Sequence, residues 1–411
     1  MKGLRKKVFV TAGYNTIFFG PGRKEFNPKK PMPKYEEYLK EAAQGTCSQL
    51  PNPDFDEGVI GNFLAGRFLR QGNIPGFLPY VVPNLLHKPC VRTEGACGSG
   101  GVALTTAIRS ILSDQADSVF VMGFEVQNTV KAVYGADYLA GADYISGKRK
   151  EGHAYYFPDQ FSKRAGAYGE KFGKDKTRRG MAKWYELSVS HARKNPKAQE
   201  YHNQVEDLFA LGMTPPDPKI FLEHLNQFDC SKVSDGASSL VFLSEEGLDK
   251  VGVKKEDCVE IIGFAQCQAD ITRPPEDNTF MPTIAAAGKG ALETAGVARD
   301  EISVLELHDC FSITSMITLE SIGFAERGKG ADFLLDEKTT IDGILPVNPS
   351  GGLCGFGHPT GATGVRQLCE LYFQLTGQAD NQVQLKQPYG MMINMGGNDV
   401  TVVSIIVKKA A

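Results

Sequence analysis

Short apolar runs alternate along the chain with longer stretches in which apolar positions recur at helical spacing. In the first 125 residues this pattern predicts strands at Val8–Thr11 and Val119–Gly123, and a helix at Gly101–Ser113. Residues Asp54–Gln71 also mix apolar and polar positions at a helical period, so we expect a helix there. Strands that alternate with helices are typical of a layered α/β fold.

The C-terminal part of the chain shows the same alternation. Its predicted elements are strands at Cys258–Gly263, Val304–Leu307, Met391–Asn394 and Val400–Val407, and helices at Met281–Ala295, Ser312–Ile322 and Val365–Thr376. Residues 396–399, with the sequence Gly-Gly-Asn-Asp, predict a hairpin between the last two strands. Because the elements follow a similar order in both parts, we expect a duplicated fold with the active site between the halves.

Residues 126–228 differ from the rest because they are polar and rich in Tyr, Lys and Arg. They predict surface helices at Asp159–Phe172 and Lys176–Arg193, and a rigid turn at Met213–Pro218. A buried strand, Leu240–Leu243, follows this segment. We therefore expect an N-terminal half formed by 1–125 and 229–257, an inserted loop domain at 126–228, and a C-terminal half at 258–411.

The charge balance and the lengths of the apolar runs exclude several classes of function. The chain has 45 Lys and Arg against 48 Asp and Glu, a formal net charge of −3. With no Lys/Arg block, we expect no nucleic-acid partner. Apolar runs such as Val402–Val407 are far shorter than the roughly 20 residues of a membrane-spanning helix, so we expect no membrane partner either.

The cysteines predict a reducing compartment. There are nine of them without a CxxC pair, and the apolar run at Val8–Val10 is too short for a signal peptide. We therefore expect free thiols in a cytoplasmic protein. The histidines outside the motifs described next show no HxxxH or HxH spacing, so we expect no metal site.

The first segment that can carry chemistry is Glu94–Gly101, where Cys97 lies among small residues directly before a helix. Peptide N–H groups and the helix dipole lower the pKa of a thiol at such a position. The glycines allow a substrate carbonyl to approach the backbone closely. Cys97 is thus a candidate nucleophile, and the alternative is a buried structural cysteine in a glycine-rich turn.

Two further segments contain candidate acid–base groups. His308 and Cys310 end an apolar strand two residues apart, so both can enter one pocket at its carboxyl end. His358 lies between Gly and Pro in the glycine-rich loop 348–364, whose spacing matches neither a P-loop nor a dinucleotide-binding fingerprint. The alternatives are packed core residues for the first pair and a helix cap or a phosphate loop for the second segment.

Two acidic residues lie near these segments. Glu125 follows a predicted strand, from which it can reach the site or form a structural salt bridge. Asp235, in a Ser-Asp-Gly-Ala stretch, is interpreted as a turn and cap residue and not as a catalytic acid.

Taken together, these motifs resemble the thiolase superfamily in order and spacing over nearly the whole chain. The motifs are Gly95–Gly100 around Cys97, Ser234–Ala237, His308–Phe311, Asn348–Gly352 and Gly357–Ala362. Within the superfamily the chain resembles the sterol-carrier-protein-type thiolases and acetyl-CoA acetyltransferase-like relatives. His308-Asp309-Cys310-Phe311 stands where most thiolases have Asn-Glu-Ala-Phe. The stretch Asn394–Gly397 lacks the second catalytic cysteine of their Cys-x-Gly motif.

The resemblance implies a five-layer α/β/α/β/α fold made of two similar halves with an inserted loop domain. It also implies thiolytic cleavage of a 3-oxoacyl-CoA, or the reverse Claisen condensation, through an acyl-Cys97 intermediate. His358 would deprotonate Cys97 and contribute to one oxyanion hole, and Cys310 would be the acid/base at the α-carbon. His308 would replace the usual Asn. The N–H groups of Cys97 and Gly396 would form the second oxyanion hole.

The resemblance further implies coenzyme A as co-substrate, with no permanently bound cofactor, and a homodimer or homotetramer. The Lys and Arg residues of 126–228 are candidates for binding the CoA phosphates. Some relatives act with a small zinc-ribbon/OB-fold partner, and we consider such a partner here. The alternatives are a decarboxylating or methylglutaryl-type synthase, a non-catalytic or partner-dependent acyl-CoA binding subunit, and a paralogue that has lost activity. The acyl chain and the direction of reaction stay open.

Overall fold

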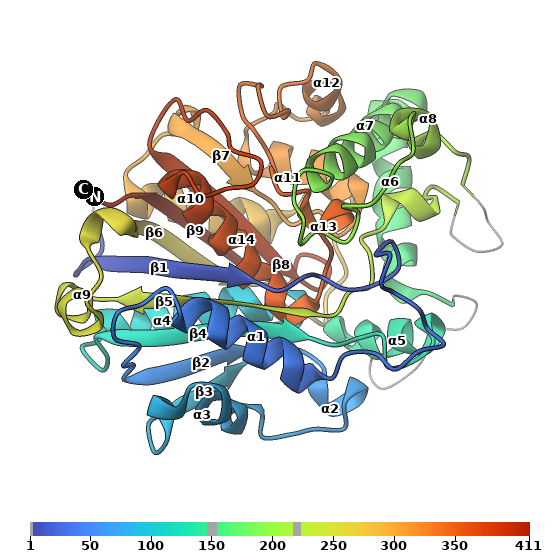
Figure 1. Cartoon of the computed structure of the whole chain (residues 1–411). Coiled ribbons are helices and arrows are strands. Elements are labelled where there is room, and N and C mark those ends of the chain that lie inside the picture. The colour runs from blue at the N-terminus through green and yellow to red at the C-terminus, as the bar shows by residue number, and fades with distance from the viewer. Residues whose placement is uncertain (1–2, 146–153, 217–222) are drawn as a thin grey trace.

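In the computed structural model, which describes residues 3–145, 154–216 and 223–411, nine strands form one sheet with the order β3-β2-β4-β5-β1-β6-β9-β8-β7 (Figure 1). The strands are β1 Val8–Asn15, β2 Glu57–Gly61, β3 Cys90–Thr93, β4 Ser118–Glu125, β5 Gly236–Leu243, β6 Val259–Gln268, β7 Ile302–Glu306, β8 Tyr389–Gly396 and β9 Thr401–Lys409.

The strands are connected by α-helices and short 3₁₀ turns. The helices are α1 Tyr35–Cys47, α2 Ala65–Phe68, α3 Leu78–Val81, α4 Ser99–Leu112, α5 Ala132–Leu139, α6 Tyr156–Phe172, α7 Lys174–Ala192, α8 Leu208–Gly212, α9 Glu245–Val251, α10 Pro282–Ala295, α11 Ser312–Ile322, α12 Gly330–Leu335, α13 Gly352–Gly355 and α14 Thr360–Thr376. The 3₁₀ turns are η1 Ile74–Phe77, η2 Pro83–Leu85, η3 Ala96–Gly98, η4 Ala140–Ala142, η5 Gln227–Asp229, η6 Lys255–Asp257 and η7 Arg299–Glu301.

The two halves of the sheet repeat one pairing scheme. In the N-terminal half, β1 pairs antiparallel with β5, β5 antiparallel with β4, and β4 parallel with β2, which pairs parallel with β3. In the C-terminal half, β6, β9, β8 and β7 pair in the same sequence of directions, and a parallel bridge from Leu305 to Val347 follows. An antiparallel β1–β6 pair joins the halves. The predicted duplication is therefore confirmed.

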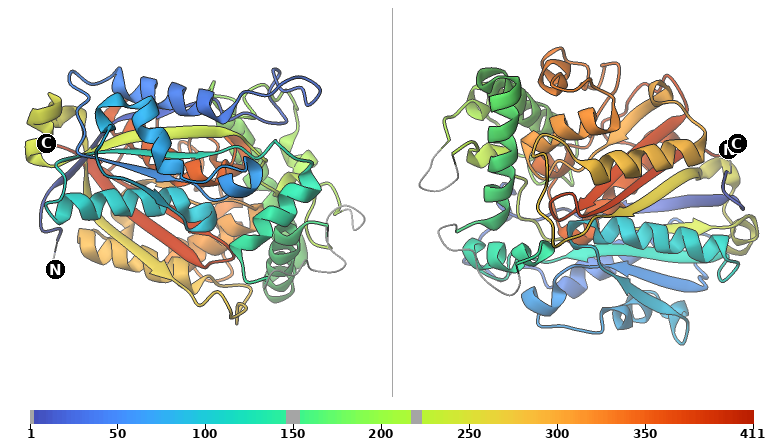
Figure 2. Two further views of the ribbon diagram at one scale, coloured as in Figure 1. Left: turned by 90° about the horizontal axis from the view of Figure 1, so that it is seen from below. Right: turned by 180° about the vertical axis from the view of Figure 1, so that it is seen from behind.

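Two helices, α4 and α14, lie between the halves of the sheet (Figure 2). They share one core with strand residues of both halves, among them Val121 and Leu240 from one side and Met392 and Val403 from the other. Helix α1 covers the outer face of the N-terminal half, and α10 and α11 cover that of the C-terminal half. The result is the predicted five-layer α/β/α/β/α arrangement.

Several predicted elements need correction. The helix expected at Asp54–Gln71 is wrong, because this stretch forms strand β2 followed by the short helix α2. Strand β2 is buried on both faces, with Val59 in the core between the halves and Ile60 in the core beneath α1, so it lacks the alternation of a surface strand. Helix α14 begins at Thr360, five residues before its predicted start, and α4 begins at Ser99.

The helices predicted at Asp159–Phe172 and Lys176–Arg193 exist as α6 and α7, but they are not surface helices. Phe161 of α6 and Trp184 of α7 are buried in the core of the C-terminal half. The inserted segment is therefore partly integrated into this core. The turn predicted at Met213–Pro218 extends outside the described residues.

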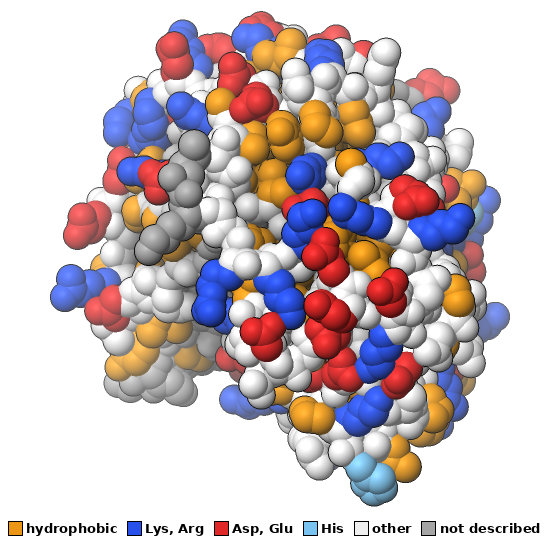
Figure 3. All heavy atoms as spheres, turned by 90° about the vertical axis from the view of Figure 1, so that its left-hand side faces the viewer, with side chains coloured by type: hydrophobic (Ala, Val, Ile, Leu, Met, Phe, Trp, Pro, Cys, Tyr) orange, Lys and Arg blue, Asp and Glu red, His pale blue; other side chains and the backbone are white. Residues whose placement is uncertain are grey.

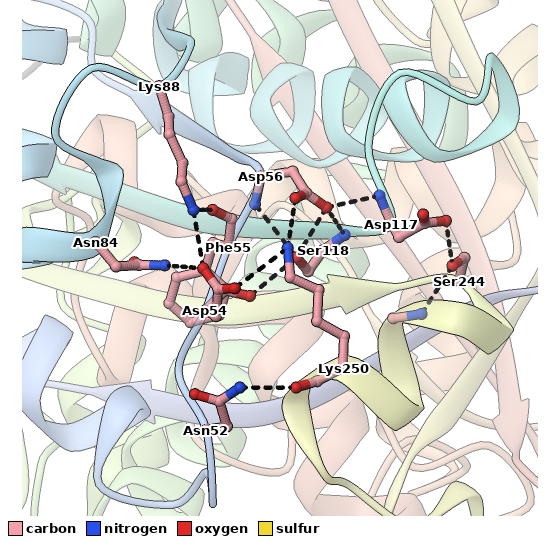
Figure 4. A network of polar contacts seen from close by, with 11 residues as sticks. Asn52, Asp54, Phe55, Asp56, Asn84, Lys88, Asp117, Ser118, Ser244 and Lys250 are labelled. Carbon is pink, nitrogen blue, oxygen red and sulfur yellow. Dashed lines mark hydrogen bonds and ion pairs between the residues drawn. The ribbon is translucent and has the colours of Figure 1, made fainter.

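A polar network anchors the loop before β2 (Figure 4). One carboxylate oxygen of Asp56 accepts hydrogen bonds from the backbone N–H groups of Asp117 and Ser118, each at 3.0 Å. The other binds the ammonium group of Lys250, which comes from α9. Asp54 pairs with Lys88 at 2.8 Å. These contacts connect β2, the start of β4 and α9 at one end of the sheet. Figure 3 shows the molecule from the left-hand side of Figure 1, and on this face acidic and basic side chains are interspersed.

We expect Asp56→Asn to lower the free energy of unfolding by about 1–3 kcal/mol, because it removes the charge from several hydrogen bonds at once. The hydrogen bond and charge of Lys250, with the backbone N–H of Asp117, hold the pKa of Asp56 below its ordinary value despite partial burial. Its contribution is therefore present at neutral pH and is lost as the pH falls through that lowered pKa.

Denaturant unfolding of the wild type and Asp56→Asn at pH 7 and pH 3 measures this difference. Asp249→Asn, which changes an exposed carboxylate on the same helix as Lys250, is the control. A difference between wild type and Asp56→Asn that stays constant over this pH range would contradict the assignment.

Candidate active site

Cys97 lies in the 3₁₀ turn η3, between β3 and α4. The turn begins with Ala96 in the left-handed region at φ +53°. It packs against the hairpin that connects β8 and β9. A Cβ added to Gly396 would come within 1.9 Å of the Gly95 carbonyl oxygen, so only glycine fits at this contact. The structure thus brings the predicted nucleophile and Gly396 together from opposite halves of the chain.

Asn394, at the end of β8, connects Cys97 with His308. Its side-chain Nδ2 lies 3.3 Å from the Cys97 carbonyl oxygen and 3.1 Å from His308 Nδ1. Its Oδ1 accepts a hydrogen bond from the Gly101 N–H at 2.9 Å, which fixes the orientation of the amide. The sequence motifs predict no role for Asn394. The signal that could have indicated one is its position at the start of the stretch in which the expected cysteine is missing.

His358 and His308 lie edge to face, with ring centroids 5.1 Å apart. His358 Nδ1 lies 2.6 Å from Thr363 Oγ1, and the Thr363 hydroxyl donates to the Pro359 carbonyl oxygen. Thr363 therefore accepts from His358, which assigns the proton of this ring to Nδ1. Nε2 of His358 is buried and has no hydrogen-bond partner among the described residues. His358 thus presents a free lone pair to the site, as a base requires.

The same argument gives His308 the opposite role. Since the Asn394 amide nitrogen donates to His308 Nδ1, the ring proton is assigned to Nε2. In its neutral form His308 therefore presents an N–H donor. The two adjacent rings offer one acceptor and one donor, which is the pairing needed to remove a proton and to bind a developing oxyanion.

Residues 308–310 alternate in direction, as predicted for an extended segment after β7. Asp309 points away from the two histidines and accepts hydrogen bonds from Trp184 Nε1 at 3.1 Å and from the Leu353 N–H at 2.8 Å. His308 and Cys310 are both buried on the other side. Cys310 is close enough to Cys97 that a Cys97 thiolate would raise the pKa of Cys310. The structure therefore brings together Cys97, His308, Cys310 and His358.

The predicted lowering of the Cys97 pKa is wrong. Burial raises the pKa of this thiol to about 12, and the carboxylates of Glu125 and Asp143 act in the same direction. The N–H groups of Cys97 and Gly397 oppose the shift but are outweighed. Burial, followed by the charge of Arg366, lowers the pKa of His358 to about 3. At neutral pH both groups are uncharged in the free site, so Cys97 depends on a base for its activation.

The pKa of the remaining two groups also favours the uncharged forms. Burial, Cys97 and Asp309 hold the pKa of Cys310 well above that of an ordinary thiol. Burial, His358 and Arg366 hold the pKa of His308 well below that of an ordinary imidazole. A neutral His308 keeps the tautomer assigned above, and a protonated Cys310 can act as an acid.

The two acidic residues singled out in the sequence have structural contacts. Glu125 accepts hydrogen bonds from the N–H groups of Phe63 and Leu64 and from the Thr360 hydroxyl at the start of α14. Asp235 accepts from the N–H groups of Gln127 and Asn128, which are distant in the sequence, so it makes a long-range structural contact and the interpretation as a turn and cap residue is wrong. Glu125 reaches the site only through the charge it presents to Cys97.

Within residues 3–145, 154–216 and 223–411, no group of three His, Cys, Asp or Glu side chains is placed to bind a metal ion. In the same described part of the chain, no helix is both long enough and apolar enough to cross a membrane.

Two family models match the chain and identify its family. The model "Thiolase, N-terminal domain" matches residues 51–246, and "Thiolase C-terminal domain-like" matches residues 266–409. The chain is 33% identical to an acetyl-CoA acetyltransferase of Methanocaldococcus jannaschii, over 86% of this chain and 88% of that protein. The chain belongs to the thiolase superfamily. It is a thiolase-type enzyme, an acyl-CoA acyltransferase.

Two further proteins match over most of this chain. Sterol carrier protein 2 of Homo sapiens is 25% identical over 97% of this chain and 72% of its own length. A solved structure of an Ltp2-ChsH2(DUF35) aldolase superposes with a TM-score of 0.77 at 20% identity, covering 98% of both chains. At this identity the structural likeness shows the fold alone.

We expect Asp143→Asn to make Cys97 more reactive, because removing a nearby carboxylate lowers the pKa of the thiol. Alkylation of Cys97 by iodoacetamide at pH 8 should become faster by a factor of about two to ten. Asparagine retains an oxygen that can accept the hydrogen bond from the Asn398 N–H, measured at 3.1 Å for Asp143. In both proteins the rate should rise with pH and reach no plateau below about pH 10.

Peptide mass spectrometry of the Cys97 peptide measures the rate, with Asp175→Asn at an exposed position of α7 as control. A plateau near pH 7 would show that the thiol of the free enzyme is activated. An unchanged rate in Asp143→Asn would show that this carboxylate does not act on Cys97.

Proposed function

We propose that the enzyme cleaves a 3-oxoacyl-CoA with coenzyme A, or catalyses the reverse condensation, through a thioester on Cys97. The observation that carries this proposal is the free lone pair of His358 Nε2, buried in the same site as Cys97, His308 and Cys310. A base with an unused acceptor, a thiol that needs activation and a second thiol of high pKa are the groups that Claisen chemistry requires.

In the cleavage direction, His358 takes the proton of Cys97 as the sulfur attacks the 3-oxo carbon. The bond between this carbon and the α-carbon breaks, and its electron pair stays on the α-carbon. Cys310 protonates that carbon, which releases acetyl-CoA and leaves a Cys310 thiolate. This thiolate takes the proton of the incoming CoA thiol, and the CoA sulfur attacks the acyl-Cys97 thioester. The acyl-CoA product leaves, and the proton on His358 returns to Cys97.

Hydrogen-bond donors stabilise the oxyanions of both steps. His308 Nε2–H faces the substrate thioester oxygen and takes the place of the family's Asn, and His358 donates from Nε2 once it is protonated. The N–H groups of Cys97 and Gly396 bind the oxyanion that forms on the attacked carbon. Removing one donor of this kind typically costs about 100- to 1000-fold in rate.

Coenzyme A enters this proposal as co-substrate and not as a resident group. The inserted segment 126–228 is the proposed side of CoA binding. Several of its basic side chains are already paired, as in Arg178 with Asp229 at 2.6 Å and Lys183 with Glu337 at 2.9 Å. We therefore expect the CoA phosphates to bind Lys or Arg side chains other than Arg178 and Lys183. We also propose that the enzyme is a cytoplasmic homodimer or homotetramer. Its proposed N-terminal half consists of 1–125 and 229–257, and its proposed C-terminal half consists of 258–411.

We expect Cys97 to gain one acyl group when the protein is mixed with acetyl-CoA or acetoacetyl-CoA. Intact-protein mass spectrometry should show the added mass in the wild type and in Cys267→Ala, and none in Cys97→Ala. Cys267, half-buried in strand β6, is the matched control because its loss leaves the site unchanged. Acylation that persists in Cys97→Ala would overturn the assignment of the nucleophile.

The same experiment tests the alternative of a non-catalytic or partner-dependent acyl-CoA binding subunit. CoA binding without acylation would support that alternative. The Ltp2-ChsH2(DUF35) aldolase motivates adding a candidate DUF35-type partner protein in that case. Acylation that appears only with the partner would support a two-component enzyme and leave Cys97 as its nucleophile.

We expect Cys310→Ala to separate the two half-reactions. Acylation of Cys97 by acetyl-CoA should lose much less rate, because the CoA thiolate is a far better leaving group than a carbanion and depends less on a proton from Cys310. Turnover of acetoacetyl-CoA with CoA should fall by about 100- to 10,000-fold, the usual contribution of a positioned acid or base. Quenched-flow acylation and steady-state thiolysis measure the two rates, again with Cys267→Ala as control. Equal losses in both rates would refute the role assigned to Cys310.

A further inference from the structure

The side chain of Arg164 on α6 is fully buried beside the proposed active site. Its Nε donates a hydrogen bond to Asn398 Oδ1 at 2.6 Å. Its Nη1 donates to the carbonyl oxygens of Asn278 and Phe280 at 3.2 and 3.0 Å. Its Nη2 is buried and has no hydrogen-bond partner among the described residues. Burying a guanidinium with unused N–H groups destabilises the fold, unless a negative charge that forms nearby compensates for the lost hydration.

Two contacts place Arg164 next to the reacting groups. Phe161, one helical turn earlier on α6, stacks on Phe311 with ring centroids 4.4 Å apart, and Phe311 directly follows Cys310. Asn398, the acceptor for Nε, follows Gly396 and Gly397 in the hairpin that packs on the Cys97 turn. Arg164 thus lies where α6, this hairpin and the Cys310 segment meet.

The groups around Arg164 that can carry negative charge include Cys310. Asp399, Asp143, Cys310 and Asp277 present negative charge to Arg164 and counteract the lowering of its pKa by burial. Cys97 and Asp309 face Cys310 and disfavour its thiolate, while the Thr314 hydroxyl favours it. Asp399 also accepts hydrogen bonds from the N–H groups of Thr283 and Ile284, one at each carboxylate oxygen.

We propose that Arg164 is a positioning residue whose guanidinium stabilises the thiolate that Cys310 becomes when it protonates the α-carbon. This inference rests on the function proposed above. In that step the S–H bond of Cys310 breaks, the proton goes to the carbanion, and the electron pair stays on sulfur. Arginine keeps its own proton at all relevant pH values, so it acts through its charge and transfers no proton. Arg164 belongs to the inserted segment, and its positive charge lies beside the site that the two halves form.

A purely structural role predicts a different outcome. If Arg164 only connected α6 to the hairpin, its loss would lower stability and leave the titration of Cys310 unchanged. If its charge stabilises the thiolate, loss of the charge raises the pKa of Cys310, and a lysine at the same position preserves most of the effect. The dependence of Cys310 reactivity on pH therefore separates the two roles.

The experiment measures iodoacetamide modification of Cys310 against pH in a Cys97→Ser background, by mass spectrometry of the Cys310 peptide. Arg164→Gln should shift the profile to higher pH by about one unit, which lowers the rate at a fixed pH about tenfold. Arg164→Lys should stay within about threefold of the parent in the range where lysine is charged. Lys163→Gln, an adjacent position on α6 with a half-exposed side chain, should leave the profile unchanged.

An unshifted profile in a folded Arg164→Gln protein would overturn the proposal, as would equal losses in the Gln and Lys variants. If Arg164→Gln does not fold, Arg164→Lys decides alone, because a tenfold loss of rate in that folded variant also overturns the proposal. The assay needs no acyl-CoA. A protein that never acylates Cys97 can therefore still show the effect of Arg164, and failure of the proposed function is recognised separately.

Discussion

The side-chain amide of Asn394 holds the two halves of the site in one arrangement. It accepts from α4 through the Gly101 N–H, and it donates toward the Cys97 carbonyl and the His308 ring. Because all three partners are internal, the amide has one orientation, and this orientation determines the tautomer of His308. The position of the nucleophile, the direction of the histidine proton and the contact between the halves thus depend on one residue. The glycine-only contact between Gly95 and Gly396 keeps the two backbones close enough for it.

The central helix α14 shows how this site is kept uncharged. All residues from Thr360 to Tyr372 are buried, including Arg366, Gln367 and Glu370. Arg366 pairs with Glu306 at 2.9 Å, and both side chains are fully buried. Burial raises the pKa of Glu306 to about 8 even though Arg366 opposes the shift. The cation in turn disfavours protonation of both His308 and His358. A buried ion pair of this kind is weak evidence that it stabilises the fold. Its chemical role is that Arg366 lowers the pKa of two neighbouring imidazoles.

Much of the architecture could be read from the sequence, because it depends on local pattern. The strands after Val119 and Val304, the helices after Cys97 and His358, and the closing hairpin all follow from periodicity and glycine placement. The motifs around Cys97, His308, Cys310 and His358 also suggested one site. The geometry that joins them could not be read, since Asn394 matters only through partners that are distant in the sequence.

The errors share a physical cause. The direction of the Cys97 pKa shift depends on burial and on the carboxylates of Glu125 and Asp143, whereas the sequence displays only the helix that follows. Strand β2 is buried on both faces, so its sequence lacks the alternation that identifies a strand with one exposed face. The buried faces of α6 and α7 do not stand out in the sequence, because polar residues such as Arg164 and His191 are buried among the apolar ones. In each case tertiary contacts outweighed the local signal.

The central place of β1 in the sheet has a consequence for how the chain folds. Among the strands of the sheet β1 is synthesised first, yet its neighbours are β5 and β6, which are made only after the whole inserted segment. Until β5 and β6 have been synthesised, the backbone of β1 has no strand with which to form hydrogen bonds. Pairings between such distant segments form slowly and expose aggregation-prone edges in the meantime. The N-terminal half therefore cannot complete its sheet as an independent early unit, and a nascent chain stalled before β5 is a natural substrate for chaperones.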